Sequence, residues 1–140
     1  MTTRNQLTIF LLTLSLPFSA QTASRTFNKS FNTENQGTIM LDLPGEIFIK
    51  AWDNPYVKIE IGVTLPSGNG SILNELASLG RYNLSSKAEG DVLTISGPNL
   101  QKQLKFKGTE LREVFTFLVF APKNLKIQLP EVTAVAELKK

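Results

Sequence analysis

Histidine and cysteine do not occur in the sequence. Their absence excludes Ser-His-Asp and Cys-His nucleophilic sites, and also zinc or copper sites built from these ligands. It leaves the fold without a disulfide, and no glycine-rich loop of the phosphate-binding kind joins a strand to a helix. What remains is carboxylate or Ser-Lys chemistry. We therefore expect no enzymatic activity, no cofactor and no metal site.

Charge of either sign is also sparse. Fifteen Lys and Arg residues stand against twelve Asp and Glu residues, a formal net charge of +3. This small excess gives no reason to expect nucleic acid as a partner. The densest basic stretch holds Lys102, Lys105 and Lys107, and we interpret it as a solvated strand face or loop.

The first twenty residues have the three parts of a cleavable signal peptide. Arg4 gives the start a positive charge, the stretch 7–16 is apolar, and Pro17 to Ala20 ends it with small residues. The apolar stretch is about half the roughly 20 residues that a membrane span requires. We expect cleavage after Ala20 or Ala23, no transmembrane span in the mature chain and no lipid attachment through cysteine.

Several segments have the alternating pattern of β-strands. They are residues 38–43, 46–52, 56–64, 81–86, 91–96 and 125–129. The turn residues Asp53-Asn54-Pro55 predict an antiparallel hairpin between the second and third segments, and Glu89-Gly90 predicts another between the fourth and fifth. The segment 113–121 is apolar on both faces, which indicates a strand covered on both sides.

One short helix is expected over about residues 71–79, capped by Ser71 and ended by Gly80. The fold class is therefore mainly β: antiparallel hairpins forming a small sandwich or a truncated β-solenoid-like sheet, with one short helix. We divide the chain into a signal peptide (1–20), an extended lead-in (21–37), a β domain (38–130) and a C-terminal tail (131–140).

Part of this pattern resembles a known family. Glu46 to Asp53 followed by Val57 to Glu60, then Glu89 to Ser96 and Val114 to Pro122, is similar to the N-terminal part of the "putative adhesin" family of exported bacterial β-solenoid proteins. The resemblance covers roughly residues 38–129. It implies an all-β scaffold, no known enzymatic activity and a periplasmic or surface location. The family's solenoid rungs normally follow this region, whereas here the sequence ends at Lys140.

The candidate ligand or partner contacts are Trp52, Asp53 and Tyr56, which lie at one predicted turn. Exposed aromatic rings stack on sugars or anchor protein partners, whereas the alternative is packing in the core or on a sheet face. Asp53 could also form an acid pair for sugar hydrolysis with Glu46 or Glu60 on the flanking strands, but this is a weaker candidate than an Asp that stabilises the turn. Calcium held by Asp53, Asn54 and Asp91 is weaker still, because no loop of spaced acidic ligands exists.

Together these features predict an exported, non-enzymatic β module of the bacterial periplasm or cell surface, acting in adhesion or surface assembly. The alternative is a periplasmic structural or sensory accessory that packs on another envelope protein. Its contact would be an open sheet edge near Leu125–Leu129. The expected partner is an envelope protein or a glycan, and self-association is also compatible with an open edge.

Overall fold

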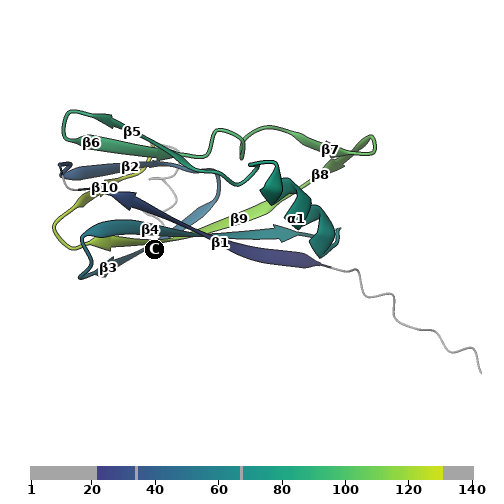
Figure 1. Cartoon of the computed structure of the whole chain (residues 1–140), viewed down its shortest axis with the longest axis horizontal. Coiled ribbons are helices and arrows are strands. Elements are labelled where there is room, and N and C mark those ends of the chain that lie inside the picture. Colours follow the sequence, from purple (N-terminus) through teal and green to yellow (C-terminus); the bar gives the residue numbers. More distant parts are fainter. Residues whose placement is uncertain (1–21, 34, 67, 131–140) are drawn as a thin grey trace, which may run out of the picture.

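The computed structural model describes residues 22–33, 35–66 and 68–130. The predicted signal peptide and tail therefore lie outside the described residues. Two four-stranded sheets stack as a sandwich (Figure 1), so the prediction of a mainly β fold with one short helix is confirmed. The alternative of a solenoid-like sheet does not describe this architecture.

The first sheet has the strand order β1-β4-β9-β3. These strands are β1 (Ala23–Asn32), β4 (Tyr56–Leu65), β9 (Val114–Pro122) and β3 (Glu46–Trp52). The second sheet has the order β10-β2-β6-β5. Its strands are β10 (Lys126–Gln128), β2 (Thr38–Asp42), β6 (Val92–Ser96) and β5 (Ser85–Glu89). Among the described strands, β10 is the outermost of its sheet, which places an edge at the expected position near Leu125–Leu129.

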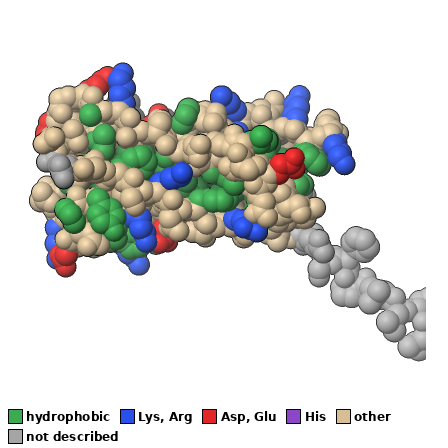
Figure 2. Space-filling model, in the orientation of Figure 1, with side chains coloured by type: hydrophobic (Ala, Val, Ile, Leu, Met, Phe, Trp, Pro, Cys, Tyr) green, Lys and Arg blue, Asp and Glu red, His purple; other side chains and the backbone are tan. Residues whose placement is uncertain are grey.

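The core lies between the two sheets, where Figure 2 shows a band of apolar side chains. Strand β4 contributes its inward residues Val57, Ile59, Ile61 and Val63, each no more than 1% exposed. They belong to one apolar cluster with residues of the second sheet, which include Ile39, Leu41, Leu93 and Ile95. Alternation places these side chains on one face of each strand, and burial of that face holds the layers together.

The extended lead-in is a full strand over most of its length. Strand β1 pairs with the whole of β4, from Ala23 opposite Leu65 to Asn32 opposite Tyr56. Phe27 and Phe31 pack against the core cluster, although polar residues surround them in the sequence. Their spacing of four residues places both on the same face of β1.

The hairpin predicted around Asp53-Asn54-Pro55 is wrong. Strands β3 and β4 run in opposite directions, but β9 lies between them and pairs with both, parallel to β3 and antiparallel to β4. A turn reverses the chain without requiring the two strands to hydrogen-bond, and the apolar β9 buries more surface in the middle of the sheet than at its edge. The β2-β6 and β10-β2 pairs are also parallel, so the sheets are mixed.

The second predicted hairpin forms, with β5 antiparallel to β6 around Gly90, but its first strand is Ser85–Glu89 rather than the predicted 81–86. A further small hairpin, β7 (Leu104–Phe106) and β8 (Thr109–Leu111), occupies the lysine-containing stretch that we interpreted as a solvated face or loop. Lys107 and Gly108 both have positive φ, as a tight two-residue hairpin turn requires.

Helix α1 (Gly70–Ser78) lies beside the N-terminal end of β1 in Figure 1. Its N-cap is Asn69 rather than the predicted Ser71, because the Asn69 side chain accepts a hydrogen bond from the Ile72 amide at 3.1 Å. The predicted stop at Gly80 is confirmed by a φ of +80°.

Among the described residues, a second layer covers strand β9 on one face only, so the prediction of cover on both faces is wrong for this part of the chain. Phe117, Val119 and Ala121 point into the core and are buried. The opposite face carries Val114, which is 54% exposed, together with the half-buried Leu118 and Phe120. Neighbouring side chains on the same sheet provide the partial cover, and the outer face of the first sheet therefore presents apolar surface.

Candidate functional site

The outer face of the first sheet carries a cluster of three aromatic side chains, Trp52, Tyr56 and Phe120, which we call the aromatic patch. Trp52 is the last residue of β3 and Tyr56 the first of β4. The indole Nε1 of Trp52 donates a hydrogen bond to the Tyr56 carbonyl at 2.8 Å. The two rings meet edge to face, with centroids 4.9 Å apart. The two aromatic residues that flank the bend between β3 and β4 thus contact each other across it.

Phe120 joins the patch from β9, the strand that separates β3 from β4. Its ring lies 5.3 Å from that of Trp52, centroid to centroid. The Nζ of Lys58 lies 4.8 Å from the Phe120 centroid, which is the geometry of a cation–π contact. The same Nζ pairs with Oε1 of Glu60 at 2.9 Å. The patch is therefore an apolar surface with a cation at its border.

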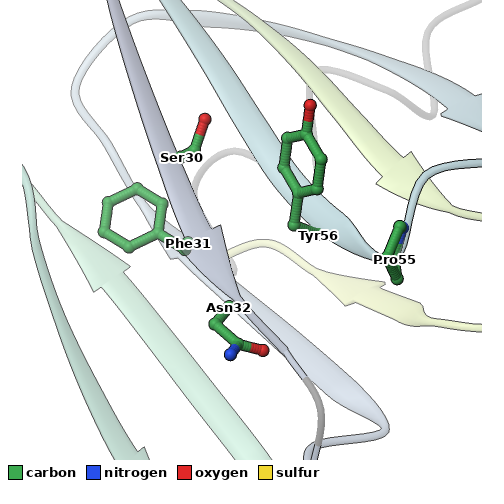
Figure 3. A pocket seen from close by; sticks show the side chains of 5 residues that line it. All are labelled: Ser30, Phe31, Asn32, Pro55 and Tyr56. Atoms are coloured by element: carbon green, nitrogen blue, oxygen red, sulfur yellow. The ribbon is translucent and has the colours of Figure 1, made fainter.

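A shallow pocket of about 290 Å³ opens beside the patch, lined by Ser30, Phe31, Asn32, Pro55 and Tyr56. Figure 3 shows the Ser30 and Tyr56 side chains rising in the same direction, with Phe31 on the other side of β1. This follows from the register, in which Asn32 lies opposite Tyr56 and Ser30 opposite Lys58. The pocket combines an exposed ring with hydroxyl and amide side chains.

Asp53 does not form an acidic site. Its side chain is 89% exposed, and its Oδ1 lies 3.0 Å from Nζ of Lys123. Glu46 stands at the opposite end of β3, and Glu60 pairs with Lys58. Asp91 lies at the β5-β6 turn, where its Oδ1 accepts a hydrogen bond from the Gly37 amide at 2.8 Å. Within residues 22–130 as described, no group of three or more potential metal ligands is present.

The sequence therefore indicates two of the three patch residues and misses the third. Trp52 and Tyr56 adjoin a recognisable turn, whereas Phe120 lies more than sixty residues further along the chain. Phe120 belongs to a strand whose two apolar faces are alike in the sequence, so no signal identifies its outer face. Ser30 and Asn32 belong to the polar lead-in and have no distinguishing pattern either.

A second hollow, of about 280 Å³, is lined by Leu76, Leu79, Arg81, Asn99, Lys102 and Gln103. Its only largely buried charged side chain is Arg81, and that group is already bonded. Arg81 donates to Glu113 and to the backbone carbonyls of Asn99 and Leu100. This arrangement is structural, because each of these hydrogen bonds joins the guanidinium to an acceptor within the protein.

No protein-family model matches the sequence, and no curated protein matches it. The fold has weak similarity to solved structures that are named as adhesion proteins. One is a "putative adhesin" from Bacteroides fragilis, with a TM-score of 0.40 and 12% identity over 75% of this chain and 39% of that one. Another is a "putative cell adhesion protein" from Clostridium sporogenes, with a TM-score of 0.42 and 10% identity over 76% of this chain and 46% of that one.

A third similar structure is a "putative lipid binding protein" from Parabacteroides distasonis. Its TM-score is 0.35 and its identity 17%, over 74% of this chain and 37% of that one. This chain thus spans less than half the length of each of the three. In the described part of the chain, no helix is both long enough and apolar enough to cross a membrane.

Proposed function

We propose that this protein is an exported, non-enzymatic β module that acts in adhesion by binding a surface glycan at the aromatic patch and its neighbouring pocket. The observation that carries the proposal is the pocket itself. It places the exposed ring of Tyr56 beside the side chains of Ser30 and Asn32. A sugar ring has an apolar face that stacks on an aromatic ring and a rim of hydroxyls that needs polar partners.

The geometry of the patch supports this assignment. Trp52 is held by its hydrogen bond to the Tyr56 backbone and by contact with Phe120, so the aromatic surface is ordered before any ligand arrives. Ordered binding surfaces lose less conformational entropy on association.

The absence of histidine and cysteine from the whole sequence supports a binding role over a catalytic one. Asp53, the best candidate for an acid, is strongly exposed and paired with Lys123. Of the two glutamates predicted as its partners, Glu46 stands at the opposite end of β3 and Glu60 pairs with Lys58, so neither forms the acid pair that glycoside hydrolysis requires. The proposed action is therefore reversible attachment.

A glycan array followed by calorimetry on the best ligand tests the proposal. Tyr56→Ala should weaken binding about ten-fold, and Ser30→Ala should weaken it by a smaller factor. Phe106→Ala is the matched control, because Phe106 is also an exposed aromatic residue but lies on β7. Binding that Tyr56→Ala leaves intact, or a protein ligand in place of any glycan, would overturn the assignment.

Export is part of the proposal and rests on the sequence of the first twenty residues. The structure favours one of the two expected cleavage positions. Ala23 is only 8% exposed and pairs with Leu65, so a cut after Ala20 leaves β1 complete, whereas a cut after Ala23 removes its first residue. N-terminal sequencing of the mature protein from fractionated cells should therefore find Gln21 first.

A further inference from the structure

Strand β3 is the outermost strand of its sheet among the described strands, and β9 pairs with it on one side only. Five of its seven residues are exposed. Two of these are large and apolar: Phe48 is 49% exposed and Ile49 is 39% exposed. An apolar edge strand with unpaired backbone groups forms hydrogen bonds with a further strand when one fits.

The sequence of β3 is complementary to itself when two copies run antiparallel with Phe48 opposite Phe48. Glu46, Phe48 and Lys50 share the outer face, because alternate residues point the same way. In this register Glu46 of each copy lies opposite Lys50 of the other. On the inner face, Ile47 of each copy lies opposite Ile49 of the other.

We propose that the partner of this edge is a second copy of the same chain, joined by β3-β3 pairing about a two-fold axis at Phe48. Two four-stranded sheets then become one continuous sheet. The pairing covers Phe48 and Ile49, places two opposite-charge pairs across the junction and satisfies the free backbone groups of both edges.

The opposite edge of the same sheet shows why β3 is the strand selected. In β1, Arg25, Phe27 and Lys29 have the same spacing as Glu46, Phe48 and Lys50. Self-pairing of β1 about Phe27 would place Arg25 opposite Lys29, so both cross-strand charge pairs would repel. The spacing is the same in the two edge strands, but one flanking charge has the opposite sign in β1, and Phe27 packs against the core whereas Phe48 is exposed.

The open edges of the second sheet fit a second copy less well. Strand β10 is three residues long. Strand β5 is exposed at every position but contains no large apolar side chain. An edge with nothing apolar to bury gains little from pairing beyond its backbone hydrogen bonds.

The dimer would also strengthen glycan binding. This consequence rests on the proposed function, whereas the proposal of the dimer does not. Facing residues of paired strands point to the same side, so both aromatic patches would lie on one face of the joined sheet. Trp52 lies four residues from the axis, and the two Trp52 residues would be about 25 Å apart along the strand direction. Two sites on one face increase attachment to a repetitive glycan by avidity.

Charge exchange tests the register. Glu46→Lys and Lys50→Glu should each weaken self-association about ten-fold in analytical ultracentrifugation, because each variant places like charges in both cross-strand pairs. The double exchange should restore it. An equimolar mixture of the two single variants should form a heterodimer, since one strand then carries two lysines and the other two glutamates. A native protein that stays monomeric at all concentrations, or a mixture that does not associate, would overturn the proposal.

An introduced cysteine gives a second test. Because the sequence contains no cysteine of its own, any disulfide must form between the introduced residues. With Phe48→Cys, the two introduced residues face each other with Cα atoms about 5 Å apart, within disulfide range. With Lys50→Cys on the same strand, they are about 13 Å apart and out of range. Rapid oxidation to a covalent dimer is expected for the first variant only. Equal rates for both would exclude the two-fold axis at Phe48, and these readouts do not depend on glycan binding.

Discussion

Arg81 and Glu113 form a largely buried ion pair between the end of the helix and the start of β9. Nε and Nη2 of Arg81 donate to Oε1 of Glu113 at 3.1 Å and 2.6 Å. The side chains are 10% and 2% exposed, respectively. The pair fixes the segment that follows α1 against the strand at the centre of the candidate site's sheet.

Removing one partner of this pair should destabilise the protein substantially. Glu113→Gln leaves the Arg81 guanidinium buried without its counter-charge, and we expect a loss of about 3 kcal/mol in the free energy of unfolding, measured with urea. Lys87→Met is the control, because the Lys87–Glu89 pair is 78% and 71% exposed and its loss should change the free energy of unfolding very little. Equal effects of the two changes would contradict the structural role of the buried pair.

Tyr82 should make the stability depend on pH in the alkaline range. Its hydroxyl and Oε2 of Glu113 are buried without a hydrogen-bond partner of normal geometry in the described part of the chain. Burial, followed by interaction with the nearby Glu113 carboxylate, raises the pKa of Tyr82 above its ordinary value. The folded state therefore holds this proton more tightly than the unfolded chain, whose tyrosine pKa is about 10.

The stabilisation from that proton is complete below pH of about 10 and is lost as the pH rises further. Tyr82→Phe should therefore lose less stability than the native protein when urea unfolding is repeated above that pH. Tyr56→Phe, at the more exposed tyrosine, is the matched control. An unchanged alkaline slope in Tyr82→Phe would contradict the prediction.

Gly45 should resist substitution because it lies against β9 immediately before β3. Its φ is +142°, and an added Cβ would lie 2.6 Å from the Phe115 carbonyl oxygen. Gly45→Ala should cost about 2 kcal/mol or more in the free energy of unfolding. Gly90→Ala should lower the free energy of unfolding by only about 1 kcal/mol. Gly90 also has a positive φ, but an added Cβ there would meet open space. Calorimetric melting of both variants would show the difference, and a reversed order would refute it.

Asn69 should contribute to stability as the N-cap of α1. Asn69→Ala removes the acceptor of the Ile72 amide and should cost about 1 kcal/mol. Ser71→Ala should have a much smaller effect, because the structure assigns the cap to Asn69. Chemical denaturation followed by circular dichroism would compare the two. A larger loss of stability in Ser71→Ala than in Asn69→Ala would show that Ser71 is the N-cap, as the sequence predicted.

Local patterns were sufficient for several individual elements, although they did not identify β1 in the polar lead-in, and the predicted strand 81–86 is a strand only from Ser85 onward. The alternation of apolar residues from Val57 to Val63 determined both the strand β4 and its buried face. Gly90 determined the β5-β6 hairpin, because adjacent strands joined by a tight turn have few other arrangements. The aromatic residues Trp52 and Tyr56 were also visible from the sequence, since they flank a turn.

Only the tertiary structure decided which strands became neighbours and which face of β9 turned outward. A period of two residues separates the faces of a strand but contains no information about its partners. Insertion of β9 between β3 and β4 brought Phe120 to Trp52, and it left β3 at the edge with Phe48 exposed. The aromatic patch and the self-complementary edge both follow from this one placement. It depends on burial summed over the whole sheet, and no local segment of the sequence determines it.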